Sequence, residues 1–408
     1  MIVACAGSQK TLLQEEFPSL PFIELRGYEI KYDKNRALTI LRLMRSIPKI
    51  LIRIKREKAW LRHFATREEL DLVISDNRYG LAIPGVCCVF MTHQLLIKTP
   101  FGGWADRMLQ HLNYRTISHF SRCWVPDTAP VGLAGELSHP RRMPAITTRY
   151  IGWLSRFGVG GGRAPGGSLA GSSGDGRGGA GVAGAGAAAE GGGHGVFLLA
   201  LLSGPEPQRT LLEKDILRQA LALEIVPPGG RLVIVRGLPG GGKPLLGLPA
   251  AGAPAAGLPS WITSYDHLPA MALEPLIREA GLVLARPGYS TLMDLQRLGK
   301  RSLLVPTPGQ TEQEYLGPYL AQKGWASCVS QRDFSLAVAL KMVGGEAGGR
   351  GAAGGAVAGA GLGAGAGLGA EPGTAAVAHG EPVGAGPGAV AEPGEMLAAE
   401  IQAVLALL

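Results

Sequence analysis

One stretch, residues 281–326, constrains the fold of this chain more than any other. An apolar run at Leu282–Ala285 ends in Arg286-Pro287-Gly288, a Ser-Thr pair opens a helix-like segment, and a second apolar run at Ser302–Val305 ends in a Pro- and Gly-rich loop. Short apolar runs that alternate with helix-like segments are typical of a parallel α/β sheet. Both loops leave the carboxyl ends of strands, where open α/β sheets bind ligands. We therefore expect an α/β fold with a ligand site at this edge.

The same alternation recurs through the chain and predicts two α/β domains, at 1–157 and 196–343. Further strands are expected at 1–6, 22–25, 71–75, 86–91, 123–126, 196–202, 231–236 and 261–265. Further helices are expected at 9–16, 104–120, 208–223, 271–279, 334–343 and 396–408. The second domain contains the stretch described above.

Three stretches interrupt this pattern, at 158–195, 237–258 and 344–395. They are rich in Gly and Ala, with Pro interspersed. Such segments bury too little apolar surface to offset the entropy lost on ordering. We expect the first to be a disordered linker and the other two to be disordered insertions.

Positive charge is concentrated in residues 31–62, which hold eleven Lys or Arg against two acidic residues in a chain of net charge +8. Apolar residues interleave with the basic ones at helical spacing. The pattern fits either a solvated basic face over a buried apolar one or a helix on an anionic membrane surface. Pro48 argues against one unbroken helix. No uninterrupted apolar span of transmembrane length is visible, so a membrane role would be peripheral.

The remaining composition favours a cytoplasmic protein. The five cysteines form no CxxC pair and no evident disulfide framework, which fits reduced thiols. No pair of histidines with a carboxylate has metal-ligand spacing, so we expect no metal site. We also expect no nucleic-acid partner, and contact with the inner face of the membrane only through residues 31–62.

Two loops carry residues suited to a diphosphate. Ser203 and Gly204 follow a strand and precede a helix, so exposed amides and the positive helix end favour an anion there, with Arg209 close by. Thr291 and Asp294 share one side of a first helical turn, where they can contact a phosphate and a ribose diol. A plain tight turn and an ordinary N-cap explain the same residues. A segment at 237–244 nearly matches a P-loop, but Pro replaces the magnesium-binding Ser or Thr.

Polar side chains at other strand ends suggest further roles. The segment Thr311–Glu314 offers donors and acceptors for sugar hydroxyls at the start of a helix. Asp76 and His93 each follow a strand of the first domain, and both are candidates for a catalytic base.

Several motifs resemble those of the sugar-nucleotide-dependent glycosyltransferases of family 28, which include the peptidoglycan N-acetylglucosaminyltransferase. They are DNRYG at 76–80, THQL at 92–95, WVPD at 124–127, GELSHP at 135–140, LSGPEPQRT at 202–210, YDHLP at 265–269, GYSTLMDL at 288–295 and PTPGQTEQEYL at 306–316. The resemblance implies a GT-B fold, in which two Rossmann-like domains face a cleft. It covers nearly everything outside the low-complexity stretches.

The resemblance also implies an activity. A family member transfers a hexosyl group, here expected to be an N-acetylhexosamine, from a UDP-sugar with inversion and without a metal or cofactor. The acceptor is unidentified and is expected to be lipid-linked or of the cell envelope. Combined with the loops above, the expected donor-binding residues are Arg156, Ser203, Gly204, Arg209, Asp266, Gly288, Tyr289, Ser290, Thr291, Asp294, Gln313 and Glu314.

The chain departs from the family pattern in two ways. Gln313-Glu314 stands where the peptidoglycan enzyme has a Gln pair, and Asp294 stands in place of a Glu, which leaves the sugar open. Residues 1–6 resemble the second strand of the family, so the first strand, its Gly-rich loop and its helix are missing. Losing a central strand leaves two unpaired sheet edges, and we expect a late start codon or a fragment. An inactive nucleotide-sugar-binding protein and a UDP-sugar epimerase of the same fold are the alternatives.

Overall fold

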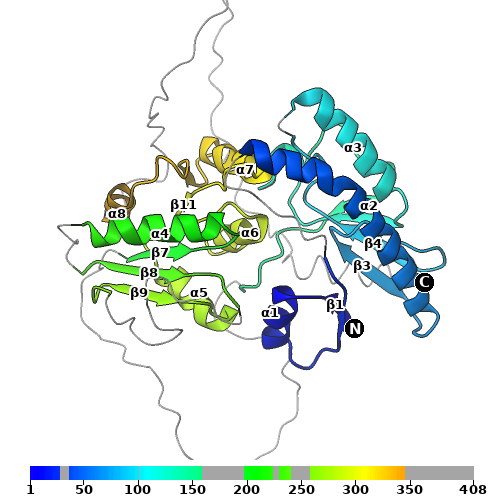
Figure 1. The fold of residues 1–408 in the computed structure, drawn as a ribbon, viewed down its shortest axis with the longest axis horizontal. Coiled ribbons are helices and arrows are strands. Elements are labelled where there is room, and N and C mark those ends of the chain that lie inside the picture. The colour runs from blue at the N-terminus through cyan, green and yellow to red at the C-terminus, as the bar shows by residue number, and fades with distance from the viewer. Residues whose placement is uncertain (28–35, 100, 159–196, 224–228, 240–257, 345–408) are drawn as a thin grey trace, which may run out of the picture.

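The computed structural model describes residues 1–27, 36–99, 101–158, 197–223, 229–239 and 258–344. They form two α/β lobes, with the N-terminal lobe in blue to cyan and the C-terminal lobe in green to orange (Figure 1). Most of the low-complexity residues and the helix expected at 396–408 lie outside the described ranges.

The strand pairs in the described part of the N-terminal lobe are all parallel. Its strands are β1 (Val3–Cys5), β2 (Phe22–Glu24), β3 (Leu72–Asp76), β4 (Cys87–Met91), β5 (Arg122–Val125) and β6 (Thr148–Tyr150). Its helices are α1 (Ser8–Glu16), α2 (Arg36–Ala65), α3 (Gly103–Ile117) and the short 3-10 helix η1 (Gly135–Leu137). β6 was not expected from the sequence.

These strands form two separate sheets. β1 pairs with β2, while the other four strands pair in the order β3-β4-β5-β6. Among the described residues, no strand bridges β1 and β3, so the two unpaired edges expected from the sequence are present. Ile74, on the edge strand β3, is 42% exposed.

The half-buried Arg78 side chain joins the two sheets. Arg78, in the turn after β3, pairs with Glu57 of α2 at 2.7 Å and donates to the carbonyl oxygens of Leu25 and Arg26, which follow β2. The N–H of Gly80 donates to the other Glu57 oxygen. The DNRYG motif therefore holds the two halves of the lobe together.

Helix α2 is continuous through Pro48, so the expected interruption there is wrong. A proline removes one backbone hydrogen bond and bends a helix, but flanking turns can maintain it. Side chains are described only from residue 48 onward in this helix. No helix in the described ranges is both long enough and apolar enough to cross a membrane.

The described residues of the C-terminal lobe form one parallel sheet of six strands, ordered β12-β11-β10-β7-β8-β9, with helices around it. Its strands are β7 (Phe197–Leu201), β8 (Arg231–Val235), β9 (Ile262–Tyr265), β10 (Leu282–Ala285), β11 (Ser302–Leu304) and β12 (Ser327–Cys328). Its helices are α4 (Gln208–Leu221), α5 (Ala270–Glu279), α6 (Tyr289–Arg297), α7 (Thr311–Gln322) and α8 (Leu336–Gly344). This strand order is that of a Rossmann fold.

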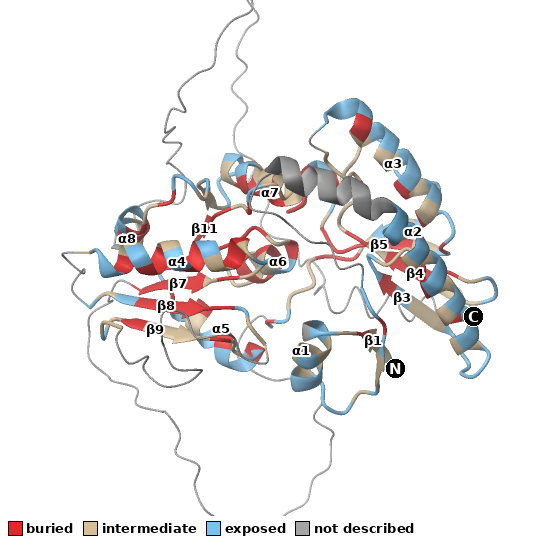
Figure 2. Ribbon diagram, in the orientation of Figure 1, coloured by how far each residue is buried: buried red, intermediate tan, exposed pale blue. Residues whose placement is uncertain are grey.

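Two apolar layers cover the faces of this sheet. One consists of side chains from α4 and α8 packed on alternate residues of the central strands, and the other is built mainly from α5. Every residue of β10 is buried, as Figure 2 shows for the central strands in red. A strand covered on both faces needs a continuous apolar run, which explains the sequence pattern at 282–285.

The two lobes share a third apolar cluster. Leu133, Ala134 and Leu137, from the segment after β5, pack against α6 and α7 of the other lobe. That segment is organised by Asp127, which is fully buried and accepts hydrogen bonds from five donors. A second contact joins the lobes where Glu16 of α1 accepts the N–H of Ala270, at the start of α5.

Candidate functional site

The strand order of the C-terminal lobe fixes where a ligand can bind. β7 and β10 are neighbours, and the chain continues from them toward opposite halves of the sheet. In open α/β sheets ligands bind outside the carboxyl ends of the strands at such a switch point. The loops that leave β7 and β10 contain Ser203, Gly204 and Gly288, so the structure brings these predicted residues to the expected edge.

The two glycines leave open space at this edge of the sheet. Gly204 has φ of 101° and Gly288 has space around it, because a Cβ added there would meet no heavy atom within 4 Å. Helix α6 begins at Tyr289 without a side-chain cap, and Ser290 in its first turn is exposed. Uncapped N–H groups and the positive end of a helix favour an anion.

Arg286 lies beneath these loops and ties them together. The residue is 1% exposed, and its guanidinium donates to the carbonyl oxygens of Val305, Pro306 and Gln208, and to Oε1 of Gln331. Burial lowers the pKa of Arg286 to about 10. The side chain is therefore still protonated at neutral pH and keeps a positive charge under the switch point.

The loop before α7 is shaped by the two residues predicted to hold the sugar. Oε1 of the buried Gln313 accepts the N–H of Thr307 at 2.9 Å, and Oε1 of Glu314 accepts the N–H of Gly309 at 2.9 Å. Both side chains thus fix the loop. Contact of Gln313 or Glu314 with a sugar stays a prediction.

Asp294 and Arg156 were predicted to contact the nucleotide, and the structure brings them together. Asp294 Oδ2 accepts from Arg156 Nε at 3.0 Å, and Oδ1 accepts from Ser155 Oγ at 2.8 Å. Burial raises the pKa of Asp294, opposed by the Arg156 charge and by these hydrogen bonds. A carboxylate has about four acceptor positions, so Asp294 can also accept a ribose hydroxyl.

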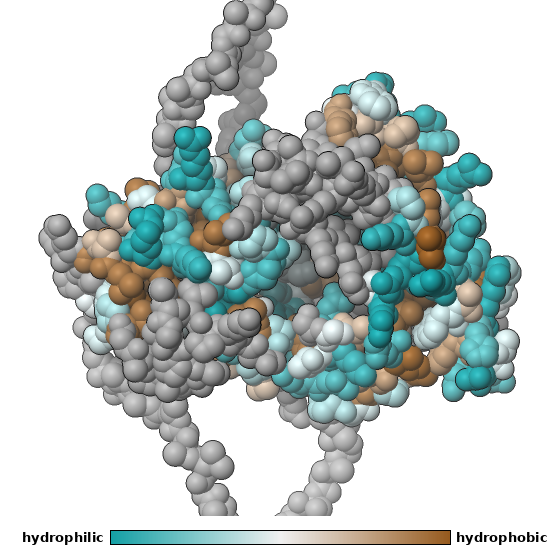
Figure 3. All heavy atoms as spheres, viewed as in Figure 1, coloured by the Kyte–Doolittle hydropathy of each residue, from teal (hydrophilic) through white to brown (hydrophobic). Residues whose placement is uncertain are grey.

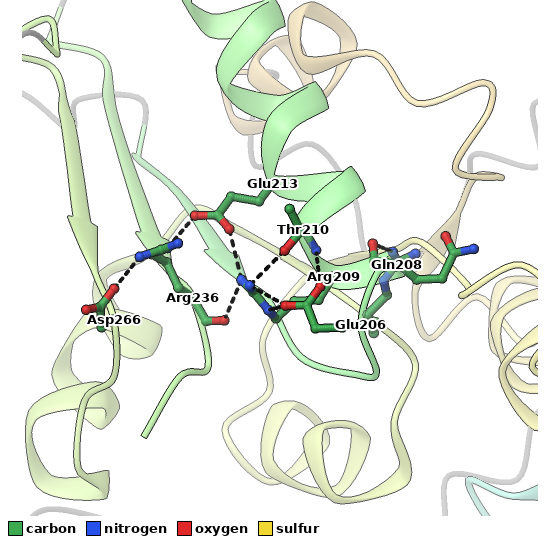
Figure 4. A network of polar contacts seen from close by, with 8 residues as sticks. Glu206, Gln208, Arg209, Thr210, Glu213, Arg236 and Asp266 are labelled. Carbon is green, nitrogen blue, oxygen red and sulfur yellow. Dashed lines mark hydrogen bonds and ion pairs between the residues drawn. The ribbon is translucent and has the colours of Figure 1, made fainter. Parts of the chain in front are cut away.

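Two other predicted donor residues belong to a buried ion network (Figure 4). Arg209 contacts Glu206 and Glu213, Glu213 also contacts Arg236, and Arg236 pairs with Asp266 at 2.5 Å. Arg209 and Asp266 are 5% and 6% exposed. The network joins the start of α4 to the carboxyl ends of β8 and β9, which gives both residues a structural role that the sequence did not indicate.

His93 is held by the opposite lobe. Its ring stacks on Tyr289 with centroids 4.0 Å apart, and its Nε2 lies 2.9 Å from Oε1 of Glu312. The Tyr289 hydroxyl donates to the carbonyl oxygen of Pro126 at 2.9 Å. A candidate base of one lobe therefore meets the donor loops of the other lobe, and Glu312 fixes its orientation.

Asp76, the other candidate base, ends β3 beside β4. Its side chain is solvent-accessible, yet surrounding protein atoms raise its pKa by desolvation, while the charge of His93 acts in the opposite direction. Asp76 thus lies near His93 in the N-terminal lobe, whereas the donor loops belong to the C-terminal lobe.

Several residues with evident roles were missed as site candidates. Asp127, Arg286, Thr307 and Glu312 were quoted within motifs or loops, but their long-range partners could not be read from local sequence. Among the residues that the structure describes, no group of three or more His, Cys, Asp or Glu could hold a metal ion.

Comparisons with known proteins agree with this geometry. Residues 256–343 match the glycosyltransferase family 28 C-terminal domain. The chain covers 81% of the solved glycotransferase of kitacinnamycin over 84% of its own length, with 12% identity and a TM-score of 0.50. A search of the curated proteins found no match.

Two further solved structures are similar. MurG of Acinetobacter baumannii has 12% identity and a TM-score of 0.40, covering 84% of this chain and 88% of that one. The spinosyn rhamnosyltransferase SpnG, solved with thymidine diphosphate, has 13% identity and a TM-score of 0.45, covering 84% and 91%. The similarity to the kitacinnamycin glycotransferase shows that the fold is the predicted GT-B arrangement of two Rossmann-like domains.

Proposed function

We propose that this chain, whose residues 256–343 match the glycosyltransferase family 28 C-terminal domain, transfers a hexosyl group, with inversion, from a UDP-sugar to an acceptor hydroxyl. The N-terminal lobe binds the acceptor, and the C-terminal lobe binds the donor. The observation that carries this proposal is the uncapped start of α6 at the switch point between β7 and β10, above the buried charge of Arg286.

The donor diphosphate lies at this switch point. Amides at Gly204 and in the first turn of α6, with the hydroxyls of Ser290 and Thr291, donate to its oxygens. Asp294 accepts a hydrogen bond from a ribose hydroxyl. Gln313 and Glu314, which hold the loop before α7, contact the transferred sugar. As UDP leaves, negative charge grows on the diphosphate, and fixed amide dipoles with the Arg286 cation stabilise it without a metal ion.

The transfer is a single displacement. The acceptor oxygen bonds to the anomeric carbon while the bond from that carbon to the UDP oxygen breaks, and UDP keeps the electron pair. The acceptor proton passes to a base of the N-terminal lobe. We assign this role to His93, because the contacts of its ring with Glu312 and Tyr289 place it beside the donor loops, whereas Asp76 has no such contact with them.

A UDP-release assay with candidate lipid-linked acceptors tests the proposal. The parent should release UDP only when donor and acceptor are both present. His93→Ala should lower kcat at least about 100-fold with donor KM nearly unchanged, and Asp294→Ala should raise donor KM. Activity of both variants equal to that of the parent would contradict the assignment. Interconversion of the sugar nucleotide without acceptor would instead identify an epimerase, and UDP binding without turnover a binding protein.

We also propose that the protein is cytoplasmic and contacts the inner face of the membrane. The sequence pointed to residues 31–62, and within the described part Leu51 and Ile52 are 55% and 52% exposed. α3 adds a stripe of exposed apolar residues four positions apart, and Figure 3 shows apolar patches among polar residues on this lobe. The stripe consists of Trp104, Met108 and Leu112, beside Arg107, His111 and Arg115.

An apolar stripe beside a basic one suits an anionic lipid surface. Trp104→Ser with Met108→Ser should abolish sedimentation with anionic vesicles, whereas Met271→Ser, which changes an exposed residue of the other lobe, should not. Binding by the parent should weaken at high salt. Equal sedimentation of the parent and the double variant would contradict the proposal.

A further inference from the structure

Buried polar atoms without a partner gather at one end of the C-terminal sheet. Within the described ranges, seven buried side-chain N or O atoms have no hydrogen-bond partner, and three belong to residues that follow β10 and β11. They are Arg286 Nε, Thr307 Oγ1 and Gln310 Oε1. Because an unpaired buried polar group destabilises a fold, such a cluster needs a reason.

Thr307 is the most informative of the three. It is fully buried, its N–H donates to Gln313 Oε1 at 2.9 Å, and its carbonyl oxygen accepts the N–H of Gln310 at 3.1 Å. Both backbone groups are thus satisfied and hold the residue in place. The hydroxyl is the one polar group of this residue without a partner.

The hydroxyl faces the switch point. A Cβ added at Gly204 would lie 3.8 Å from Thr307 Oγ1 and would meet no other heavy atom within 4 Å. Thr307 therefore points from the loop after β11 toward the loop after β7, across the loop after β10. The loops after β7 and β10 are those assigned above to the donor diphosphate.

The charge next to Thr307 favours an anion. Arg286 donates to the carbonyl oxygens of Val305 and Pro306, the residues directly before Thr307, and to two other neutral acceptors. None of these partners is a carboxylate. A buried cation without an ion-pair partner in its own contacts stabilises negative charge nearby.

We propose that the Thr307 hydroxyl donates a hydrogen bond to a diphosphate oxygen of the nucleotide-sugar donor. This inference rests on the proposed function and adds a binding residue to its site. A hydroxyl on a charged phosphate oxygen makes a strong hydrogen bond. Without such a ligand, a valine of the same shape would suit this buried position better than threonine.

Calorimetric titration with UDP tests the inference, using the full chain and three variants. Thr307→Val should weaken UDP binding at least about 10-fold, because a hydrogen bond to a charged group is lost. Thr307→Ser keeps the hydroxyl and should bind UDP within about threefold of the parent. Thr263→Val, a change on β9 away from these loops, should leave UDP binding unchanged.

Thermal unfolding without ligand separates a binding role from a structural one. Thr307→Val should unfold at the same temperature as the parent or higher, because it replaces an unpaired buried hydroxyl with a methyl group. A lower unfolding temperature together with unchanged UDP affinity would assign Thr307 a structural role and overturn the inference. Equal UDP affinity of the parent and Thr307→Val would overturn it alone, whereas a parent that binds no UDP would overturn the proposed function as well.

Discussion

Replacing Asp127 with alanine should strongly destabilise the protein. Its side chain is 0% exposed and accepts from the N–H groups of Thr128, Leu133 and Ala134, the hydroxyl of Ser138 and the indole of Trp153. The distances from donor to carboxylate oxygen run from 2.6 to 3.1 Å. Because Leu133 and Ala134 pack on the C-terminal lobe, loss of this carboxylate should also loosen the contact between the lobes.

The magnitude follows from the donors left behind. The contacts of Leu133, Ala134 and Ser138 with Asp127 are buried. Each buried donor without a partner costs roughly 1–3 kcal/mol. Since such costs are not additive, we expect Asp127→Ala to lower the free energy of unfolding by at least about 4 kcal/mol, a large part of the typical total of about 5–15 kcal/mol.

Urea unfolding followed by circular dichroism measures this effect. Asp106→Ala is a matched control, because Asp106 accepts a hydrogen bond of 2.7 Å from the half-buried N–H of Thr99. That variant should lose only about 1–2 kcal/mol. Equal urea midpoints of Asp127→Ala and Asp106→Ala would contradict the role given to Asp127.

Three further predictions concern stability. Gly80→Ala should lower the urea midpoint, because the added Cβ would lie 2.5 Å from Glu57 Cβ; a midpoint equal to that of the parent contradicts the packing described. Tyr289→Phe should lower the free energy of unfolding by about 1 kcal/mol, because it removes the hydrogen bond to the other lobe and keeps the ring. A much larger decrease would contradict a role limited to this one hydrogen bond. Burial raises the pKa values of Cys123 and Tyr79 to about 12. In the unfolded chain Cys123 loses its proton above about pH 8.5 and Tyr79 above about pH 10, whereas the native chain keeps both protons. The free energy of unfolding should therefore fall as pH rises toward about 12. Equal urea midpoints at about pH 8 and about pH 10.5 would contradict this.

Local patterns were sufficient for most of the fold. The apolar run at 282–285 forms β10 as expected, because a strand covered on both faces must be apolar throughout. The missed strands β6 and β12 have three and two residues, too short for any periodicity to show. Pro48 was misjudged, since helix propensity at one residue is weaker than the context of a thirty-residue helix.

The site was predictable as a set of loops but not as a set of contacts. Strand ends located Ser203, Gly288 and the first turn of α6, since topology alone brings them together. The acidic partners of Arg209, Glu206 and Glu213, are close in sequence. Local sequence could not show that they belong to a larger buried network, because Arg236 lies 27 positions from Arg209. The unpaired hydroxyl of Thr307 was equally invisible, since a missing partner is a property of the folded chain.

Hydrogen exchange with and without UDP tests the central claim, that the donor binds at the switch point of the C-terminal sheet. Exchange of each peptide is read by mass spectrometry, and no acceptor is needed. UDP should slow exchange in the loops that follow β7, β10 and β11 and in the first turns of α6 and α7, and it should leave α3 unchanged. Protection confined to the N-terminal lobe, or absent from these loops at saturating UDP, would contradict the account.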